Sequence, residues 1–275
     1  MSGARSLRPS ADRLRDHVRA RYGSIAVGSG CCGTGEVSGT CCGGSGATSS
    51  CCGDASLAKQ LGYGANELAL LPDGANLGLG CGNPTALLAL RLGETVLDLG
   101  SGAGIDCFLA ARRVGPRGRV IGVDMTPEML GKARANARTG RYRNVEFRLG
   151  EIEHLPVPDR SVDVVLSNCV INLAPDKEAV YREAYRVLRP GGRLAVSDVV
   201  ATRSISEKDR SDPSLWSSCS SGAMEVRALR RVLRKVGFGG VSVALRGTAA
   251  AAKTLEGPRS LGVVPADICA TRPSG

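Results

Sequence analysis

The sequence has few of the side chains on which general-base catalysis and base stacking depend. Aromatic residues make up only 3% of its 275 residues, and the two histidines are His17 and His154. His17 lies among charged residues of a helical segment and His154 in a loop, so we interpret both as structural or solvated. The chain therefore offers few candidates for a general base, and its core must be built mostly from aliphatic residues.

Long apolar segments are also missing. No apolar run approaches the roughly 20 residues that a membrane-spanning helix needs. The first 23 residues contain six arginines and lack the apolar centre of a signal peptide. We therefore expect a cytoplasmic protein with no membrane partner.

Positive charge is in excess, with 36 Lys and Arg against 26 Asp and Glu. A hydrophobic content of 43% excludes global disorder. The basic residues are not interleaved with aromatic ones, and residues 225–236 space them as the solvated face of a helix. We therefore expect no nucleic-acid partner.

Eleven cysteines stand out against this background. A reducing compartment disfavours structural disulfides. A count of eleven thiols therefore indicates metal or metalloid binding, or redox catalysis. Six of them form Cys-Cys pairs at 31–32, 41–42 and 51–52, inside a Gly/Ser/Thr-rich stretch over 28–53. This stretch is too poor in large apolar residues to pack a core, so we predict a flexible arm that follows a short amphipathic helix at 11–22.

From residue 95 onward, short apolar segments alternate with segments of helical periodicity. Such alternation predicts a parallel, doubly wound α/β sheet of five strands. The predicted strands cover 95–100, 119–124, 145–150, 162–168 and 193–200, and the helices cover 105–115, 126–138, 176–188 and 225–236. Thr126 is the expected N-cap of its helix, with Pro127 at the first helical position.

The chain divides into three parts on this basis. We assign residues 1–56 to the N-terminal helix and Cys-rich arm, and residues 57–200 to the domain that holds the sheet. Residues 201–275 form a small C-terminal domain with weaker patterns.

The first predicted strand ends in the sequence DLGSGAG, at 98–104, just before a predicted helix. Glycines there let backbone N–H groups approach a ligand at the start of the helix. Their G-x-G-x-G spacing differs from the G-x-G-x-x-G of dinucleotide-binding folds. Asp98 would repel a pyrophosphate but suits a cationic ligand. Asp124 ends the second strand, where a carboxylate can accept hydrogen bonds from ribose hydroxyls.

These features resemble class I S-adenosylmethionine-dependent methyltransferases. The resemblance implies a Rossmann-like sheet and a cofactor that carries a sulfonium cation and an amino-acid tail but no phosphate. It also implies that residues 150–152 contact adenine and that Asn168 faces the crevice for methyl transfer. The cofactor-binding residues implied in this way are Asp98, Gly100, Ser101, Gly102, Gly104, Asp124, Met125, Glu151, Ile152 and Asn168.

Three cysteines lie in settings that generic methyltransferases do not share. Cys81 lies in GLGCGNP before the sheet, Cys169 in SNCVINLAPDK after the fourth strand, and Cys219 in WSSCSSGAM after the fifth. Together with IDCFLAA, VIGVDMTPEM, NVEFRLGEIEHLPV and RVLRPGG, these segments resemble arsenite methyltransferases over residues 57–225. The resemblance implies that the three cysteines bind trivalent arsenic as substrate, with no resident metal ion.

The same resemblance implies further roles. An upstream cysteine exchanges a disulfide with Cys81, and either Cys51 or Cys52 matches it, with Cys52 preferred. The substrate is arsenite or its glutathione conjugate, the reductant is thioredoxin or glutathione, and the C-terminal domain completes the arsenic site. We interpret Cys107 and Cys269 as ordinary, largely buried residues.

Thiol chemistry accounts for the scarcity of general bases. Trivalent arsenic is thiophilic, and thiolates are soft ligands. Arsenic bound by sulfur keeps a lone pair and has no proton to lose, so it can attack a sulfonium methyl group without a base. Methylation raises arsenic formally to the pentavalent state, and closure of a disulfide can return the two electrons.

Two other functions stay open at this point. A C-methyltransferase for quinones or sterols would share the sheet but would not depend on thiols. A non-catalytic protein that sequesters or senses metals would hold zinc or copper on the Cys-Cys pairs. The pairs lack the C-x2-C spacing of structural zinc sites, which disfavours this last function.

Overall fold

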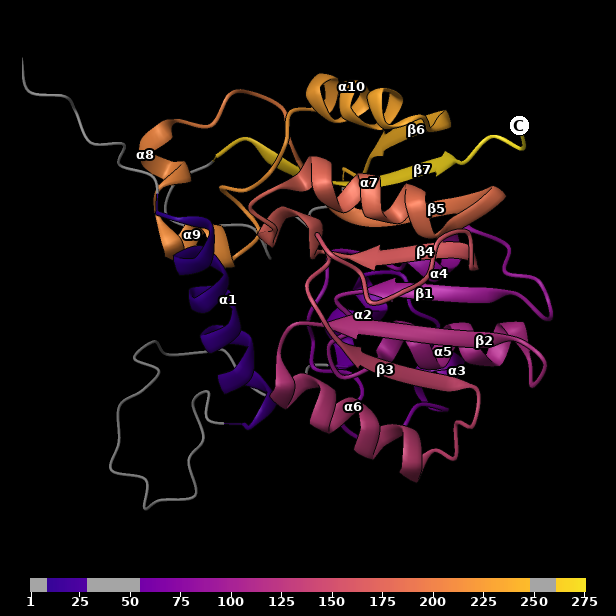
Figure 1. The fold of residues 1–275 in the computed structure, drawn as a ribbon. Helices are drawn as coiled ribbons and strands as arrows, with labels where there is room; N and C mark the ends of the chain where they lie inside the picture. Colours follow the sequence, from indigo (N-terminus) through magenta and orange to yellow (C-terminus); the bar gives the residue numbers. More distant parts are fainter. Residues whose placement is uncertain (1–8, 29–54, 248–260) are drawn as a thin grey trace, which may run out of the picture.

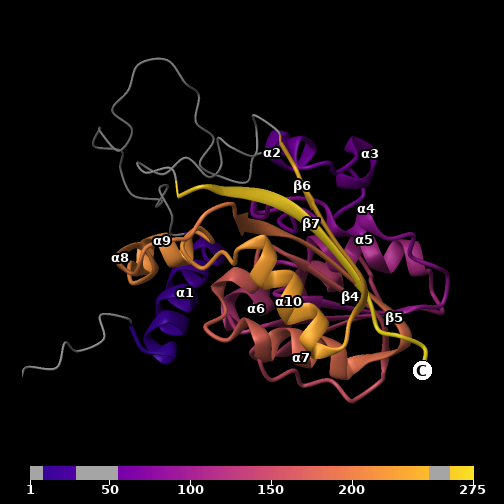
Figure 2. The same cartoon turned by 90° about the horizontal axis from the view of Figure 1, so that it is seen from above.

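The computed structural model describes residues 9–28, 55–247 and 261–275. Its centre is a seven-stranded sheet with helices on both faces (Figures 1 and 2). The strand order is β3-β2-β1-β4-β5-β7-β6, in which β1 to β5 are parallel and β7 runs antiparallel to both of its neighbours. The strands are β1 (Thr95–Leu99), β2 (Arg119–Asp124), β3 (Val145–Leu149), β4 (Val162–Asn168), β5 (Leu188–Ala201), β6 (Gly239–Leu245) and β7 (Val263–Thr271).

Helices follow β1, β2 and β4, as the sequence pattern predicts, whereas residues 150–161 connect β3 to β4 without a helix. The doubly wound α/β sheet is therefore confirmed, and the predicted helices lie within a few residues of the observed ones. The longer helices are α1 (Ala11–Ala26), α5 (Ile105–Val114), α6 (Pro127–Thr139), α7 (Lys177–Val187) and α10 (Val226–Val236). The short ones are α2 (Ala55–Gln60), α3 (Ala65–Leu68), α4 (Pro84–Leu87), η1 (Ile171–Leu173), α8 (Glu207–Arg210) and α9 (Pro213–Ser217).

The sheet extends further toward the C-terminus than the sequence predicted. β7 pairs with β5 from Val263 to Thr271, and β6 pairs with the other edge of β7. Residues of β6, β7 and α10 share one hydrophobic cluster with β1 and β2. The boundary that we predicted at residues 200 and 201 lies inside β5, close to the end of that strand.

The strand that we predicted over 193–200 begins five residues earlier, so the segment Arg189-Pro190-Gly191-Gly192 lies within β5. α7 does end just before it, at Val187, but β5 already begins at Leu188. The side chain of Arg272 explains the early start, because its guanidinium donates to the carbonyl oxygens of Tyr185 and Leu188 at 2.7 and 2.9 Å. Backbone hydrogen bonds join Arg272 to both glycines. The C-terminal segment thus satisfies the last carbonyl groups of α7.

Apolar side chains alternate between the two faces of the sheet, as a two-residue period requires. Leu97 and Leu99 lie in the cluster with α7 and α10, whereas Val96 lies in a second cluster with α5 and α6. Figure 2 shows α5 on one side of the sheet and α7 and α10 on the other. Burial on both faces is typical of parallel sheets and makes the carboxyl ends of the strands a rigid platform.

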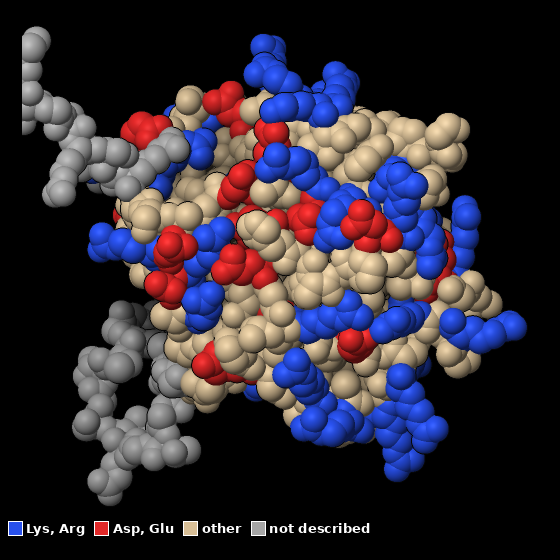
Figure 3. Space-filling view, in the orientation of Figure 1, with Lys and Arg blue, Asp and Glu red and all other residues tan. Residues whose placement is uncertain are grey.

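α10 presents the basic face that the sequence predicts. Leu229 and Leu233 are its buried residues, and Figure 3 shows Lys and Arg side chains grouped over it. The basic side chains around a shallow depression there are Arg227, Arg230, Arg231, Arg234 and Lys235. Within the described part of the chain, every helix is too short or too polar to span a membrane.

Candidate active site

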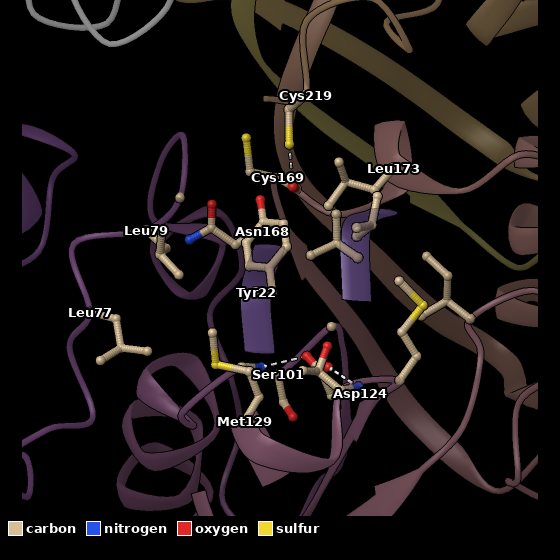
Figure 4. A pocket seen from close by; sticks show the side chains of 18 of the residues that line it. Tyr22, Leu77, Leu79, Ser101, Asp124, Met129, Asn168, Cys169, Leu173 and Cys219 are labelled. Carbon is tan, nitrogen blue, oxygen red and sulfur yellow. Dashed lines mark hydrogen bonds between the residues drawn. The ribbon is translucent and has the colours of Figure 1, made fainter. Parts of the chain in front are cut away.

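A pocket lies where β1, β2 and β4 end, and residues of α1 line it as well. Figure 1 shows α1 along this edge of the sheet. The carboxyl ends of neighbouring parallel strands meet at one edge of a sheet, which explains why residues far apart in sequence converge there. Figure 4 shows Ser101 and Asp124 toward one end of the pocket and Cys169 and Cys219 toward the other. The pocket therefore has a polar end and a sulfur-lined end.

The glycine-rich loop after β1 forms the floor of the polar end. Gly100, Gly102 and Gly104 have φ angles of 69, 51 and 99°, in the left-handed region that favours glycine. Asp124 fixes this loop, because its carboxylate accepts the Gly102 N–H at 2.9 Å and the Thr126 N–H at 2.8 Å. Thr126 is the N-cap of α6 as predicted, but its side chain makes no capping hydrogen bond. Asp124 thus joins the glycine-rich loop to the residue that precedes α6.

Asp98 is a buried carboxylate at the end of β1, with 2% of its surface exposed. The Cys107 thiol donates to it at 3.2 Å, and no Lys or Arg in the described residues forms an ion pair with it. Burial, with a smaller effect from the nearby Asp106 carboxylate, raises the pKa of Asp98 well above its ordinary value. A buried carboxylate that has no cationic partner in the protein suits a ligand with a positively charged group, such as an ammonium group.

Most of the predicted cofactor-binding residues line this pocket. The members of the predicted set found there are Asp98, Gly100, Ser101, Gly102, Asp124, Met125, Ile152 and Asn168. Gly104 and Glu151 are not part of the lining. Gly104 instead caps α5, and Glu151 pairs with Arg15 at 3.2 Å and with Arg19 at 3.8 Å.

α1 contributes residues to the pocket that sequence analysis missed. Arg15, Val18, Arg21 and Tyr22 line it, and Arg15 also forms an ion pair with the buried Glu153 at 3.1 Å. The amphipathic pattern predicted the helix but not its partner, because Glu153 lies 138 residues further along the chain. The only local signal was the apolar face of the helix, which packs over the site.

All three cysteines that the sequence singled out meet at the other end of the pocket. Cys81 and Cys169 are joined as a disulfide, with 5.5 Å between their Cα atoms. The Cys219 thiol donates to the backbone oxygen of Cys169 at 3.0 Å. The resemblance implied a disulfide between Cys81 and an upstream cysteine, whereas Cys169 is the partner here. Cys51 and Cys52, like the earlier Cys-Cys pairs, lie outside the described residues.

Cys169 and Cys219 have an unusual backbone conformation. Their φ angles are 58 and 61°, in the left-handed region that residues with a Cβ seldom adopt. Strain of this kind costs on the order of 1–3 kcal/mol and concentrates at functional sites. The Asp198 carboxylate and the sulfurs of Cys81 and Cys169 all lie within 4.8 Å of one another. The sulfur-lined end is thus both strained and polar.

Burial keeps the third thiol protonated. The pKa of Cys219 is raised, first by burial and then by the charge of Asp198, while a hydrogen bond from Tyr22 acts in the opposite direction. A ligand must therefore displace the proton when it binds this sulfur. Because Tyr22 belongs to α1, the helix over the pocket also contacts the sulfur-lined end.

The other two described cysteines lie apart from this cluster. Cys107 is fully buried in α5, and Cys269 is half-buried in β7. The prediction of a buried residue is therefore confirmed for Cys107, whose thiol also has a polar partner in Asp98, whereas Cys269 is only half-buried. The described cysteines thus fall into two groups, three at the pocket and two away from it.

Comparison with known proteins places this geometry in a family. A model described as "Methyltransferase domain" matches residues 90–237, more than half of the chain. The chain therefore belongs to the methyltransferase-domain family, and the class I, Rossmann-like fold that we predicted is confirmed.

Within that family the similarity is more specific. The chain is 53% identical to an arsenite methyltransferase of Halobacterium salinarum over 85% of its own length and 59% of that protein. It is 47% identical to one of Aquipseudomonas alcaligenes over 58% of its own length and 47% of that protein. The chain thus spans about half the length of these curated relatives.

One solved structure supports the same similarity. The crystal structure of an arsenic(III) S-adenosylmethionine methyltransferase from Chlamydomonas reinhardtii is 35% identical, with a TM-score of 0.57. The match covers 79% of this chain and 73% of that one. The resemblance to arsenite methyltransferases that the sequence showed is therefore confirmed.

Replacement of Asp124 tests the polar end of the pocket. We expect Asp124→Ala to weaken binding of S-adenosylmethionine by about 1.5–3 kcal/mol, because it removes a charged acceptor and releases the glycine-rich loop. Arsenite affinity should stay close to that of the unaltered protein. Separate calorimetric titrations with each ligand measure both quantities, with the exposed Asp73→Ala as control. Equal losses for the two ligands would contradict the assignment of Asp124 to the cofactor.

Proposed function

We propose that this protein is an arsenite methyltransferase that transfers methyl groups from S-adenosylmethionine to trivalent arsenic held by Cys81, Cys169 and Cys219. The observation that carries the proposal is that these three cysteines line the same pocket as Asp98 and the glycine-rich loop. A generic methyltransferase has no need of three sulfurs there. The similarity to arsenite methyltransferases supports the same assignment.

The polar end of the pocket fits S-adenosylmethionine by its chemistry. Asp98 is a buried acceptor for the ammonium group, and Asp124 is an acceptor for ribose hydroxyls. Ile152 and Met125 offer apolar contact for the adenine ring. When bound, the cofactor supplies an electrophilic methyl group on a sulfonium centre. The carboxylates match its positive charge, and a phosphate-bearing cofactor would be repelled.

At the sulfur-lined end, the three thiols replace the hydroxyl groups of arsenous acid. Each thiol proton leaves with one hydroxide as water, so the bound arsenic carries three sulfur ligands and one lone pair. Because burial raises the pKa of Cys219, the free thiolate is disfavoured. The sulfur is therefore more stable bound to a thiophilic centre such as arsenic than as a free thiolate. The lone pair attacks the methyl group, which requires positioning but no general base.

Reduction belongs to the same cycle. The disulfide between Cys81 and Cys169 must be opened before both sulfurs can bind arsenic. We propose that glutathione or thioredoxin supplies the two electrons through thiol–disulfide exchange. The same pair can close again when methylated arsenic returns from the pentavalent to the trivalent state. The proposed role is detoxification of arsenite.

The direct test mixes the protein with arsenite, methyl-labelled S-adenosylmethionine and glutathione, and then separates the arsenic species. We expect label in methylated arsenicals and none when arsenite or the thiol reductant is omitted. Arsenite binding without any transfer of label would contradict the proposal and favour a metal-sequestering protein. Transfer to a quinone or sterol, independent of thiols, would favour a C-methyltransferase.

A further inference from the structure

Two glycines flank Cys81, and the missing side chain of each lets a residue far along the chain pack against the backbone. These residues are Asn168, at the end of β4, and Arg246, just after β6. Gly80 has a φ angle of 124°, and a Cβ built on it would lie 2.9 Å from Nδ2 of Asn168. A Cβ on Gly82 would collide with the guanidinium of Arg246. The backbone on both sides of Cys81 is therefore open to close approach by these two side chains.

Asn168 holds the loop from the side of β4. Its Oδ1 accepts the Cys81 N–H at 3.0 Å, and its Nδ2 donates to the Gly82 carbonyl oxygen at 2.8 Å. The same amide lies 2.8 Å from the Tyr63 hydroxyl and 3.1 Å from Oδ2 of Asp106. Tyr63 in turn donates to Asp106 at 2.8 Å, so the orientation of the Asn168 amide is fixed by buried partners.

Arg246 holds the loop from the end of the edge strand β6. It follows β6, and its Nη2 donates to the Cys81 carbonyl oxygen at 3.2 Å. The same nitrogen pairs with Oδ1 of Asp267 in β7 at 2.9 Å, and the Arg246 N–H donates to Pro265 at 2.8 Å. The Arg246 guanidinium therefore links the C-terminal strands to the Cys81 backbone.

We propose that Asn168 and Arg246 are positioning residues that clamp the Cys81 backbone from two sides and hold its sulfur beside that of Cys169. Asn168 immediately precedes Cys169, so one residue fixes the two cysteines relative to each other. The inference deepens the proposed function, because two preset sulfurs bind arsenic without the entropy cost of ordering a loop. It gives Asn168 a role in addition to the one that the resemblance implied, because its amide contacts the Cys81 loop while the residue also lines the pocket.

The equilibrium for closing the Cys81–Cys169 disulfide reports how well the two sulfurs are positioned, and it can be measured without arsenic. One protein dithiol and one oxidised glutathione form one protein disulfide and two reduced glutathiones, so the equilibrium constant gives the effective concentration of one sulfur at the other. We expect Asn168→Ala and Arg246→Ala each to lower that concentration by about tenfold. Gly82→Ala, which displaces the guanidinium, should resemble Arg246→Ala. Mass spectrometry of the linked Cys81–Cys169 peptide in the full-length protein quantifies the product.

Two matched variants separate positioning from general stability. The Asn144 amide donates to two backbone carbonyls far from the site, and Arg193 bridges the Ala89 carbonyl oxygen and Glu94. Asn144→Ala and Arg193→Ala should leave the effective concentration unchanged, even where they lower the unfolding temperature. Arg246→Lys, which keeps one charged donor, should restore part of the loss.

Two outcomes would overturn the clamp: wild-type effective concentrations in both Asn168→Ala and Arg246→Ala, or equal losses in the control variants. A separate result bears on the proposed function alone. If the clamp variants lower the effective concentration as expected while the unaltered protein fails to methylate arsenite, the clamp stands and the arsenite methyltransferase assignment fails.

Discussion

Cys169→Ser and Cys219→Ser should each abolish methylation of arsenite. An alcohol is a hard, weakly acidic ligand that cannot replace a thiolate on arsenic. Cys107 and Cys269 do not line the pocket, so neither can take their place. Arsenite affinity and the rate of label transfer, measured on both variants, give the result.

Cys81→Ser should have the same effect on inorganic arsenite and should also remove the disulfide with Cys169. A substrate that already carries a methyl group needs only two protein thiols, so it should still bind to Cys169 and Cys219 in this variant. Slow turnover of that substrate is expected, because the redox partner of Cys169 is gone. This difference between substrates distinguishes Cys81 from the other two cysteines.

Cys269→Ser is the matched control for all three variants. Cys269 is half-buried in β7 and does not line the pocket, so its replacement should leave activity intact. Cys107→Ser should mainly change stability, since the side chain is buried under Asp98. Thermal unfolding confirms that each variant folds. If Cys169→Ser methylates arsenite at the wild-type rate, the three-thiol mechanism is wrong.

The convergence of the three cysteines was predictable because it follows from local signals and topology. Glycine-rich turns mark where strands end, and parallel strands end at one edge of the sheet. Cys169 directly follows β4, and the glycines around Cys81 indicate a loop that can approach another backbone. The parallel pairing of β1 to β5 follows from the same alternation of strands and helices, whereas their order in the sheet does not.

The contacts that hold the site together were not predictable, because each depends on a partner far along the chain. Arg246 reaches Cys81 across 165 residues, and Asn168 reaches it across 87. The spacing of apolar residues along the sequence carries no information about such long-range pairs. The role of α1 was missed for the same reason, since its apolar face predicts burial but not the surface that buries it. The early start of β5 could not be predicted either, because it depends on contacts with Arg272, which lies 84 residues after Leu188.

Asp98→Asn should nearly eliminate binding of S-adenosylmethionine and at the same time stabilise the cofactor-free protein. The amide keeps the shape of the carboxylate but cannot neutralise the ammonium group of the ligand. A buried charge left without its partner costs about 3–5 kcal/mol, so affinity should fall by more than about a hundredfold. Calorimetric titration with S-adenosylmethionine measures the loss. Unchanged affinity would show that Asp98 does not face the ammonium group.

The gain in stability has a definite dependence on pH. Burial raises the pKa of Asp98 above its ordinary value of 3.8, so the folded protein binds the proton more tightly than the unfolded chain does. The ionised carboxylate therefore destabilises the fold at pH values above the raised pKa, and this penalty fades as the pH falls toward 3.8. Asp98→Asn should thus be more stable than the unaltered protein at about pH 8, with a smaller difference at about pH 5.

Asp163→Asn provides the opposite case. Asp163 is ion-paired with Arg189 at 2.6 Å and accepts the Thr95 N–H at 2.8 Å, so its carboxylate already has partners in the folded state. Its replacement should lower the unfolding temperature at about pH 8, where Asp98→Asn raises it. A destabilised Asp98→Asn would mean that the carboxylate has a favourable partner in the cofactor-free protein. Asp98 would then not be an unpaired carboxylate that awaits a cation. It would have to lose its existing partner before it could bind the ammonium group of the ligand.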